Sequence, residues 1–270
     1  MKDTDIARRG LVLLGCGKMG SAMLEGWLNR GLPNASVWVL DPQPSDWLQS
    51  SGVHLNDGLP DDPAVVLIAV KPQMMGDALP GLQALGNGAT LFVSVAAGIP
   101  IATYERLLGS DTPVIRAMPN TPAAVGRGIT AIIGNARTDA KQMDQAELLL
   151  SAVGEVVRLD DEAQMDAVTG VSGSGPAYVF HMIECLAAAG EAEGLAPDLA
   201  LQLARATVAG AGALAMAGED PGQLRKNVTS PGGTTQAGLE VLMDEENGLP
   251  PLMRATVRAA AARSKALADG

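Results

Sequence analysis

Up to about residue 160 the chain alternates short apolar runs with amphipathic stretches. Each run is almost continuous in valine, leucine and isoleucine, which is typical of strands covered on both faces of a parallel sheet. The stretches between them repeat apolar residues at helical spacing, so the pattern predicts an α/β fold with a Rossmann-type doubly wound sheet. The expected strands cover residues 11–14, 36–40, 64–70, 90–95, 113–117 and 129–133, with a weaker one at 155–159, and the clearest helices cover 19–30 and 139–153.

After about residue 160 the alternation stops, alanine dominates, and glycine or proline separates runs of helical length. We therefore expect two domains, a dinucleotide-binding domain over residues 1–162 and an all-helical domain over 163–270. The expected helices cover residues 176–193, 197–217, 221–227, 234–246 and 250–267. Residues 199–217 carry few charges on any helical face, and a helix of this kind must bury those faces, so we expect an obligate oligomer.

Composition narrows the classes of function. The chain has 270 residues, 47% of them hydrophobic, and a formal net charge of -11, which indicates a folded protein and argues against a nucleic-acid partner. No apolar run is long enough to predict a membrane span or a signal peptide. The cysteines, Cys16 and Cys185, are too few and too far apart for a disulfide framework or a zinc site, so we expect a cytoplasmic protein without a metal.

The first expected strand leads directly into a glycine loop, GCGKMG, and then into an amphipathic helix. In such a loop the first glycine permits a tight turn, the second lets the backbone approach a pyrophosphate, and the third allows close packing of helix and strand. The positive end of the helix faces the phosphates. We interpret the loop as a dinucleotide site in preference to a purely structural turn; its residues are Gly15, Cys16, Gly17, Lys18, Met19 and Gly20.

Asp41 ends the second expected strand, near the position where an acidic side chain reads the adenosine ribose of NAD. Its charge would repel the 2′-phosphate of NADP, and residues 41–47 offer no arginine or lysine to bind that phosphate. The pattern therefore favours NAD over NADP by a modest margin. A capping or turn aspartate is the alternative interpretation.

Three more strand ends carry candidate residues, because open α/β sheets bind ligands beyond the carboxyl ends of their strands. Lys71 is expected to meet the nicotinamide half of the coenzyme or a phosphate, with a solvated lysine as the alternative. Residues 118–122 either line the same crevice or form only a rigid turn. The other candidates at these ends are Ala69, Val70, Pro72, Ala96 and Ala97.

Two flexible turns open helices in the second half, at residues 171–177 and 229–235. The second turn offers backbone amides and hydroxyls that suit a small carboxylate, and ordinary helix capping is the alternative. The groups concerned belong to Ser230, Gly233, Thr234 and Thr235.

Taken in order, these loops resemble those of the pyrroline-5-carboxylate reductase family, and the resemblance spans nearly the whole chain. The motifs that carry it are GCGKMG (15–20), AVKP (69–72), VAAG (95–98), RAMPNTPA (116–123), VTGVSGSGPAYVF (168–180) and PGQLRKNVTSPGGTTQAGLEVL (221–242). The resemblance implies reduction of 1-pyrroline-5-carboxylate to L-proline by NADH or NADPH, the last step of proline biosynthesis. It also implies a helical domain for substrate binding and dimerisation, with the active site at the interface of a homodimer or of a higher oligomer built from dimers.

The resemblance further implies roles for single residues. The stretch from Gly233 to Thr235 would hold the substrate carboxylate, and Thr235 would contact and orient the ring nitrogen as the catalytic residue. Asn227 would approach the coenzyme, while the segments 69–72 and 96–97 would cradle its nicotinamide side.

Two positions depart from the family pattern. Asp41 stands where many relatives carry a serine or threonine suited to NADP, which leaves the choice between NAD and NADP unsettled. Glu219 lies beside the position of a glutamate that contacts substrate in some relatives, so no role is transferred to it.

Two other functions stay open from the residues alone. A β-hydroxyacid dehydrogenase shares this domain plan but moves the alcohol proton with a lysine-bearing helix, and residues 176–184 contain no lysine. His54 and His181 are expected to be structural and offer no substitute. A non-catalytic dinucleotide sensor would keep the glycine loop without needing a substrate pocket at residues 229–235.

Overall fold

The computed structural model describes residues 1–268 and divides the chain into two compact units. The first unit, which we call the Rossmann unit, consists of residues 1–173 together with the end of the chain from Ala260. The second, the helical unit, is Ser174–Ala259. The boundary expected after residue 162 lies within the first of these units.

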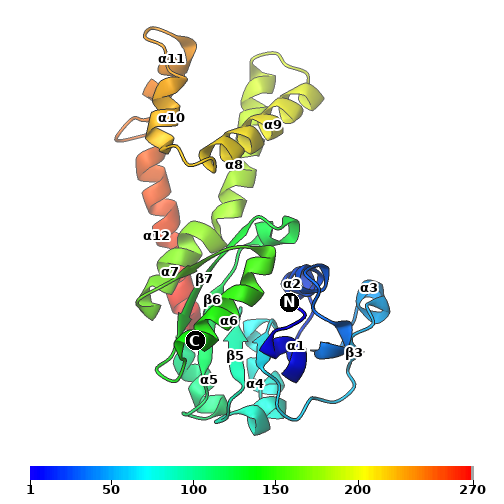
Figure 1. Cartoon of the computed structure of the whole chain (residues 1–270). Helices are drawn as coiled ribbons and strands as arrows, with labels where there is room; N and C mark the ends of the chain where they lie inside the picture. The colour runs from blue at the N-terminus through cyan, green and yellow to red at the C-terminus, as the bar shows by residue number, and fades with distance from the viewer. Residues whose placement is uncertain (269–270) are drawn as a thin grey trace. The chain divides into compact units, whose positions relative to one another are not determined.

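An eight-stranded sheet forms the centre of the Rossmann unit (Figure 1). Its strand order is β3-β2-β1-β4-β5-β6-β7-β8. Its strands are β1 Leu11–Leu14, β2 Val37–Leu40, β3 His54–Leu55, β4 Val65–Ile68, β5 Leu91–Ser94, β6 Val114–Met118, β7 Gly128–Gly134 and β8 Gly154–Arg158. Every strand expected from the sequence is present, and the Rossmann-type class is confirmed. The strand order changes direction between β1 and β4, which is where such sheets bind dinucleotides.

The sheet departs from the expected parallel arrangement near one edge. β7 runs antiparallel to β6 and parallel to β8, whereas the other neighbouring strands are parallel. The link between β6 and β7 contains the short 3-10 helix Thr121–Val125, and a parallel crossover needs a dozen or more residues. A wholly parallel sheet is therefore a wrong expectation. The structure also adds β3, an edge strand of two residues that is too short to produce an alternation pattern.

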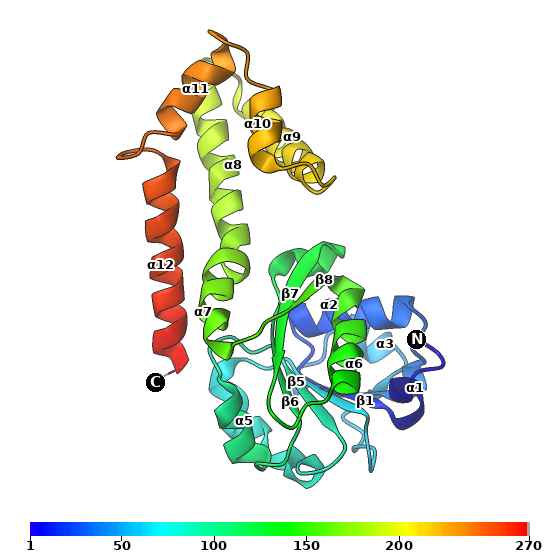
Figure 2. The same ribbon diagram turned by 60° about the vertical axis from the view of Figure 1, so that its left-hand side comes forward.

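The Rossmann unit has a hydrophobic core on each face of the sheet. Leu13 packs in one core with Trp27, and its neighbour Val12 packs in the other with Tyr104. Consecutive strand residues point to opposite faces, which explains why the run 11–14 is apolar throughout. Helices α2 Lys18–Asn29 and α6 Ala140–Leu150 cover the first core, and α4 Met75–Ala78 and α5 Ile101–Leu108 cover the second. Figure 2 shows α2 and α6 on one side of the sheet and α5 on the other.

The expected helices 19–30 and 139–153 are confirmed as α2 and α6. Shorter helices were not expected, because a run of four to eight residues shows little helical periodicity. Besides α4 and α5, these are α1 Asp5–Arg9, α3 Asp46–Ser50 and α7 Met165–Val168.

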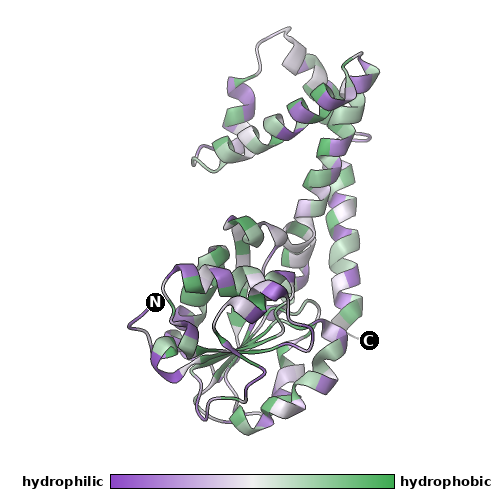
Figure 3. Cartoon of the chain, turned by 90° about the vertical axis from the view of Figure 1, so that its right-hand side faces the viewer, coloured by the Kyte–Doolittle hydropathy of each residue, from purple (hydrophilic) through white to green (hydrophobic). Residues whose placement is uncertain are grey.

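The helical unit has the expected helices: α8 Gly175–Ala192, α9 Pro197–Ala215, α10 Pro221–Asn227, α11 Thr234–Leu242 and the start of α12 Leu249–Ala268. Prolines stand in the first turns of α8, α9 and α10, where a helix tolerates them. The buried apolar side chains of this unit are Ala187, Ala200 and Ala204. Large apolar side chains lie exposed along its helices, so the unit has apolar surface for another chain to cover. Figure 3 shows the hydrophobic residues distributed along these helices. Across residues 1–268, no helix combines the length and apolar character needed to cross a bilayer.

Candidate active site

The ends of four neighbouring strands form the candidate dinucleotide site. Leu14 at the end of β1 pairs in register with Leu40 of β2 and Ile68 of β4, and Ile68 pairs with Ser94 of β5. The segments that follow these residues therefore leave the sheet from one edge. They contain the expected coenzyme residues of the Rossmann unit, at positions 15–20, 41, 69–72, 96 and 97, while Asn227 belongs to the helical unit.

The backbone of the glycine loop excludes a side chain at two positions and leaves space at a third. Gly15 has a φ of +88°, and a Cβ there would meet Val70 at 2.9 Å and the carbonyl oxygen of Ala69 at 3.1 Å. A Cβ on Gly20 would collide with the carbonyl oxygen of Gly15. A Cβ on Gly17 would meet no atom within 4 Å. The loop thus packs closely against the sheet and stays open at Gly17, which fits the close approach of a pyrophosphate.

Helix α2 begins directly after this open position. Its N-cap is Gly17, which has no side chain to cap the first amides. Lys18 is exposed and Met19 is half-buried. The first turn therefore offers amides without helical partners, and the positive end of the helix dipole, to a bound anion. This local attraction matters because the net charge of -11 opposes the approach of anions.

Asp41 is bonded to the glycine loop through its carboxylate. Oδ2 accepts a hydrogen bond from the backbone N–H of Cys16 at 2.6 Å, and Oδ1 accepts one from the backbone N–H of Gln43 at 2.8 Å. The backbone of Asp41 also exchanges two hydrogen bonds with the side chain of Asn56. The carboxylate therefore braces the loop as well as placing negative charge at the end of β2. Sequence reasoning missed this brace, since it joins residues 25 apart in the chain.

The thiol of Cys16 is buried beneath the loop, with Sγ 3.5 Å from Oγ of Ser21. Burial raises the pKa of the thiol, which keeps it neutral at physiological pH. Cys16 therefore takes part in the loop through its backbone amide and adds no negative charge beside the phosphate site.

Small residues occupy the ends of β4 and β5. The backbone N–H of Ala69 donates to the carbonyl oxygen of Leu14 at 2.8 Å, which holds the β4 end against the glycine loop. Ala96 is buried and Ala97 is exposed beyond β5. Lys71 is exposed and precedes the short 3-10 helix Pro72–Met74, to which its side chain gives no capping hydrogen bond. These ends place small side chains and one exposed lysine beside the glycine loop.

The segment 118–122 contacts the glycine-rich turn that precedes α8. The side chain of Asn120 accepts a hydrogen bond from the backbone N–H of Ile129 at 3.0 Å and donates one to Oγ of Ser172 at 3.3 Å. Ser172 lies in a π-helical segment, Thr169–Gly173, of a kind that often marks functional sites. Two of the sequence motifs thus meet within the Rossmann unit, although they are about fifty residues apart.

The candidate substrate loop precedes α11 in the helical unit. Gly233 is the N-cap of this helix and provides no side-chain cap, so Thr234 and Thr235 begin the helix with amides that have no helical partner. The amide of Gly233 itself donates to the carbonyl oxygen of Ser230 at 3.0 Å. A free amide at Gly233 is therefore a wrong expectation, because the turn closes on itself.

Asn227, at the end of α10, has both ends of its side-chain amide engaged. Nδ2 donates to Oε1 of Glu219 at 2.9 Å, and Oδ1 accepts from Nε2 of Gln223 at 2.7 Å. Glu219, to which the sequence assigned no role, therefore fixes the orientation of Asn227. Among residues 1–268 no group of three or more histidine, cysteine, aspartate or glutamate side chains is placed to hold a metal ion.

The open glycine loop, the uncapped helix start and the acidic end of β2 define a dinucleotide-binding protein of the Rossmann class. Comparison with known families refines this class. Residues 10–98 match the family model "NADP oxidoreductase coenzyme F420-dependent", and residues 162–267 match the model "Pyrroline-5-carboxylate reductase dimerisation". The protein is thus an NAD(P)-dependent oxidoreductase that associates through its helical part.

Individual relatives agree with the family models. The pyrroline-5-carboxylate reductase of Pseudomonas aeruginosa is 40% identical over 266 residues, covering 96% of this chain and 97% of the relative. The structure of the reductase from Coxiella burnetii matches with a TM-score of 0.90 and 33% identity, over 96% of this chain and 98% of that one. The Plasmodium falciparum pyrroline carboxylate reductase, solved with NADP bound, matches with a TM-score of 0.83 and 28% identity, over 97% and 99% of the two chains.

The chain belongs to the pyrroline-5-carboxylate reductase family. The similarity covers both units, so neither the hydroxyacid dehydrogenase nor the non-catalytic sensor is needed to explain the chain.

Proposed function

We propose that the protein reduces 1-pyrroline-5-carboxylate to L-proline with NADH or NADPH. The observation that carries the proposal is the open position at Gly17, ahead of an uncapped helix, in a chain that matches reductases over nearly its full length. The open position supports a bound dinucleotide, and the family supports the imine substrate.

The chemistry suits a site without a strong general acid. The substrate is a cyclic imine whose protonated nitrogen makes the neighbouring ring carbon electrophilic. When bound, the reduced nicotinamide supplies a hydride to that carbon, and the nitrogen keeps its proton as the C=N bond becomes the C–N bond of proline. The chain has to hold the substrate in line for this transfer, because alignment accounts for much of the rate of such a step.

The start of α11 is suited to that task. The amides of Thr234 and Thr235 lie at the positive end of the helix and would bind the substrate carboxylate. The hydroxyl of Thr235 would hydrogen-bond the ring nitrogen and orient the imine. Ser230 and Gly233 complete the binding loop in this proposal. The carbonyl oxygen of Ser230 accepts a hydrogen bond from the backbone N–H of Gly233, and the hydroxyl of Ser230 would bind the substrate.

For the coenzyme, we propose a preference for NADH. The carboxylate of Asp41 lies at the end of β2 and is fixed there by the amides of Cys16 and Gln43. A 2′-phosphate at this end would meet that negative charge, whereas ribose hydroxyls can donate hydrogen bonds to it. The proposal concerns preference only, because a relative has been solved with NADP bound.

We propose a homodimer, or a higher oligomer built from dimers, as the working form. The exposed apolar side chains of the helical unit support this proposal. The acidic charge supports a small-molecule substrate in preference to nucleic acid, and the two free cysteines favour the cytoplasm, which is a reducing compartment.

The experiment is a coenzyme oxidation assay with the purified protein. Nicotinamide absorbance is followed with 1-pyrroline-5-carboxylate, and in parallel with short 3-hydroxyacids and the oxidised coenzymes. Rapid oxidation of NADH by the imine, with little turnover of the hydroxyacids, supports the proposal. Absence of imine turnover at every pH tested, with coenzyme binding intact, would overturn it.

A further inference from the structure

Two buried hydroxyl groups lie beneath the loop that follows β5. Oγ of Ser94 and the phenol oxygen of Tyr104 are 2.5 Å apart, and their residues are 1% and 0% exposed. Oγ of Ser94 also accepts a hydrogen bond from the backbone N–H of Ala96 at 3.3 Å. Tyr104 in helix α5 is therefore linked through Ser94 to the first residue of the candidate nicotinamide segment, Ala96–Ala97.

The far end of the same loop is held by a half-buried ion pair. Oε1 of Glu162 accepts a hydrogen bond from the backbone N–H of Ile101, the first residue of α5, at 2.9 Å. The same oxygen accepts one from the guanidinium of Arg116 at 2.8 Å. The N-cap of α5 is Pro100, which gives no side-chain cap, so Glu162 supplies the cap from outside the helix. Both ends of the loop are thus fixed by polar groups within the Rossmann unit.

The loop that follows β5 lies on the side of the site where the nicotinamide half of the coenzyme is expected. The glycine loop follows β1, and Asp41 at the end of β2 marks the adenosine side. The nicotinamide half would therefore extend in the other direction, over the ends of β4 and β5. Ser94 is the last residue of β5 and lies in the same row as Leu14 of β1, so the pair lies directly under that half.

We propose that the Tyr104–Ser94 hydroxyl pair positions the Ala96–Ala97 segment against the nicotinamide half of the coenzyme. The two side chains are positioning residues, since they act through the backbone of Ala96. Burial raises the pKa of Tyr104 to about 12, so the phenol keeps its proton throughout the working pH range. The inference rests on the proposed function, because it assumes a bound nicotinamide coenzyme.

The test separates the two halves of the coenzyme in binding experiments. Dissociation constants are measured separately for the reduced coenzyme and for the fragment that lacks nicotinamide. NADH is compared with ADP-ribose if the wild-type protein prefers NADH, and NADPH is compared with 2′-phospho-ADP-ribose if it prefers NADPH. For Tyr104→Phe and Ser94→Ala we expect the Kd of the reduced coenzyme to rise about threefold to tenfold, the range of one net hydrogen bond. The Kd of the fragment should stay within about twofold of wild type, and kcat should fall with the imine substrate.

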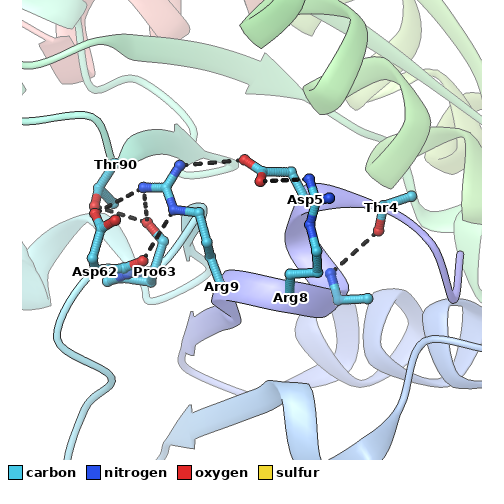
Figure 4. Close-up of polar contacts among 8 residues, drawn as sticks. Thr4, Asp5, Arg8, Arg9, Asp62, Pro63 and Thr90 are labelled. Atoms are coloured by element: carbon cyan, nitrogen blue, oxygen red, sulfur yellow. Dashed lines mark hydrogen bonds and ion pairs between the residues drawn. The ribbon is translucent and has the colours of Figure 1, made fainter.

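Thr90→Val is the matched control at the opposite end of β5. Thr90 is 2% exposed, and its hydroxyl donates to the carbonyl oxygen of Pro63 at 2.8 Å, in the polar cluster at the amino-terminal edge of the sheet (Figure 4). Removing this buried hydrogen bond should cost similar stability and leave both dissociation constants unchanged.

The inference would be overturned if, in Tyr104→Phe and Ser94→Ala, the Kd of the reduced coenzyme and the Kd of the fragment changed equally. It would also be overturned if neither Kd changed. A rise in the Kd of the reduced coenzyme for Thr90→Val as well would also overturn it, because the effect would then be a general loss of stability. The proposed function fails separately, if the wild-type protein binds the coenzyme but does not reduce the imine.

Discussion

The Rossmann unit and the helical unit differ in how much of their apolar surface one chain can bury. All four residues of β1 are buried, and the sheet has a core on each face. Helix α9 has 19 residues, of which Ala200 and Ala204 are buried. The Rossmann unit is therefore complete within one chain, whereas the helical unit leaves apolar surface for another chain to cover. Its match to a dimerisation model agrees with this. Coenzyme binding and assembly should consequently respond to different substitutions.

The largest expected effect follows from a charge placed on α9. Leu203 is 48% exposed in the single chain and lines a groove with Leu186 and Leu195. If a second copy covers this face, Leu203→Glu buries an unpaired carboxylate at a cost of about 3–5 kcal/mol, which weakens association roughly a thousandfold. Sedimentation equilibrium measures the change in the dissociation constant of the oligomer.

Leu148→Glu is the control for this substitution, because Leu148 is 40% exposed but lies on α6 of the Rossmann unit. It should leave association unchanged. If both variants dissociate, or neither does, the contrast between the two units is wrong.

A smaller effect is expected at the glycine loop. Gly17→Ala adds a methyl group that meets no atom within 4 Å in the protein, so the melting temperature should not change. The methyl group should instead keep the pyrophosphate away from the backbone. Losing such charge-assisted hydrogen bonds costs about 2–3 kcal/mol, or about 30- to 150-fold in the Kd of the coenzyme, which calorimetry measures.

Gly81→Ala, another position where a Cβ meets nothing within 4 Å, is the control and should bind the coenzyme normally. Wild-type affinity in Gly17→Ala would mean that the dinucleotide does not approach the backbone at this loop.

Within the helical unit, Thr235→Ala should separate the substrate from the coenzyme. We expect kcat/KM for the imine to fall about tenfold, as for one lost hydrogen bond, with coenzyme affinity nearly intact. Thr235→Ser restores the hydroxyl and should recover most of the activity. Thr256→Ala, which removes a hydroxyl from α12, should have little effect. Steady-state kinetics and binding titrations measure the two quantities, and a dominant loss of coenzyme binding in Thr235→Ala would contradict the assigned role.

The smallest expected effect concerns the choice of coenzyme. Asp41→Ser removes the negative charge at the end of β2 that would repel the 2′-phosphate of NADPH. The ratio of kcat/KM with NADPH to kcat/KM with NADH should therefore rise, by only about fivefold because water screens this repulsion. Asp57→Ser makes the same change in net charge at an exposed position and serves as the control. An unchanged ratio for Asp41→Ser would remove this residue from the account of specificity.

Local signals in the sequence predicted elements of both units. The strand 11–14 and the helix 221–227 were predicted with their observed ends, because glycines flank the apolar strand and a proline begins the helix. The glycine loop was placed between strand and helix for the same reason. All of these signals are local. The exposed apolar faces of α9 were anticipated as well, since its small number of charged residues is a property of the sequence itself.

Contacts between distant residues could not be predicted. The hydrogen bond from Cys16 to Asp41, the Ser94–Tyr104 pair and the cap that Glu162 provides for Ile101 each join separate elements. No periodicity or motif encodes such pairs, and they become visible only after the sheet has brought strand ends together. The antiparallel β7 was missed for a related reason, because the direction of a strand depends on its connection and its neighbours.

The central claim is that this chain delivers a hydride from a nicotinamide coenzyme to the imine carbon of 1-pyrroline-5-carboxylate. The most direct measurement uses reduced coenzyme carrying deuterium at the transferred position of C4 and analyses the product by mass spectrometry and NMR. We predict L-proline one mass unit heavier, with deuterium at the ring carbon that formed the C=N bond. Unlabelled proline, or no proline in the presence of active coenzyme binding, would contradict the claim.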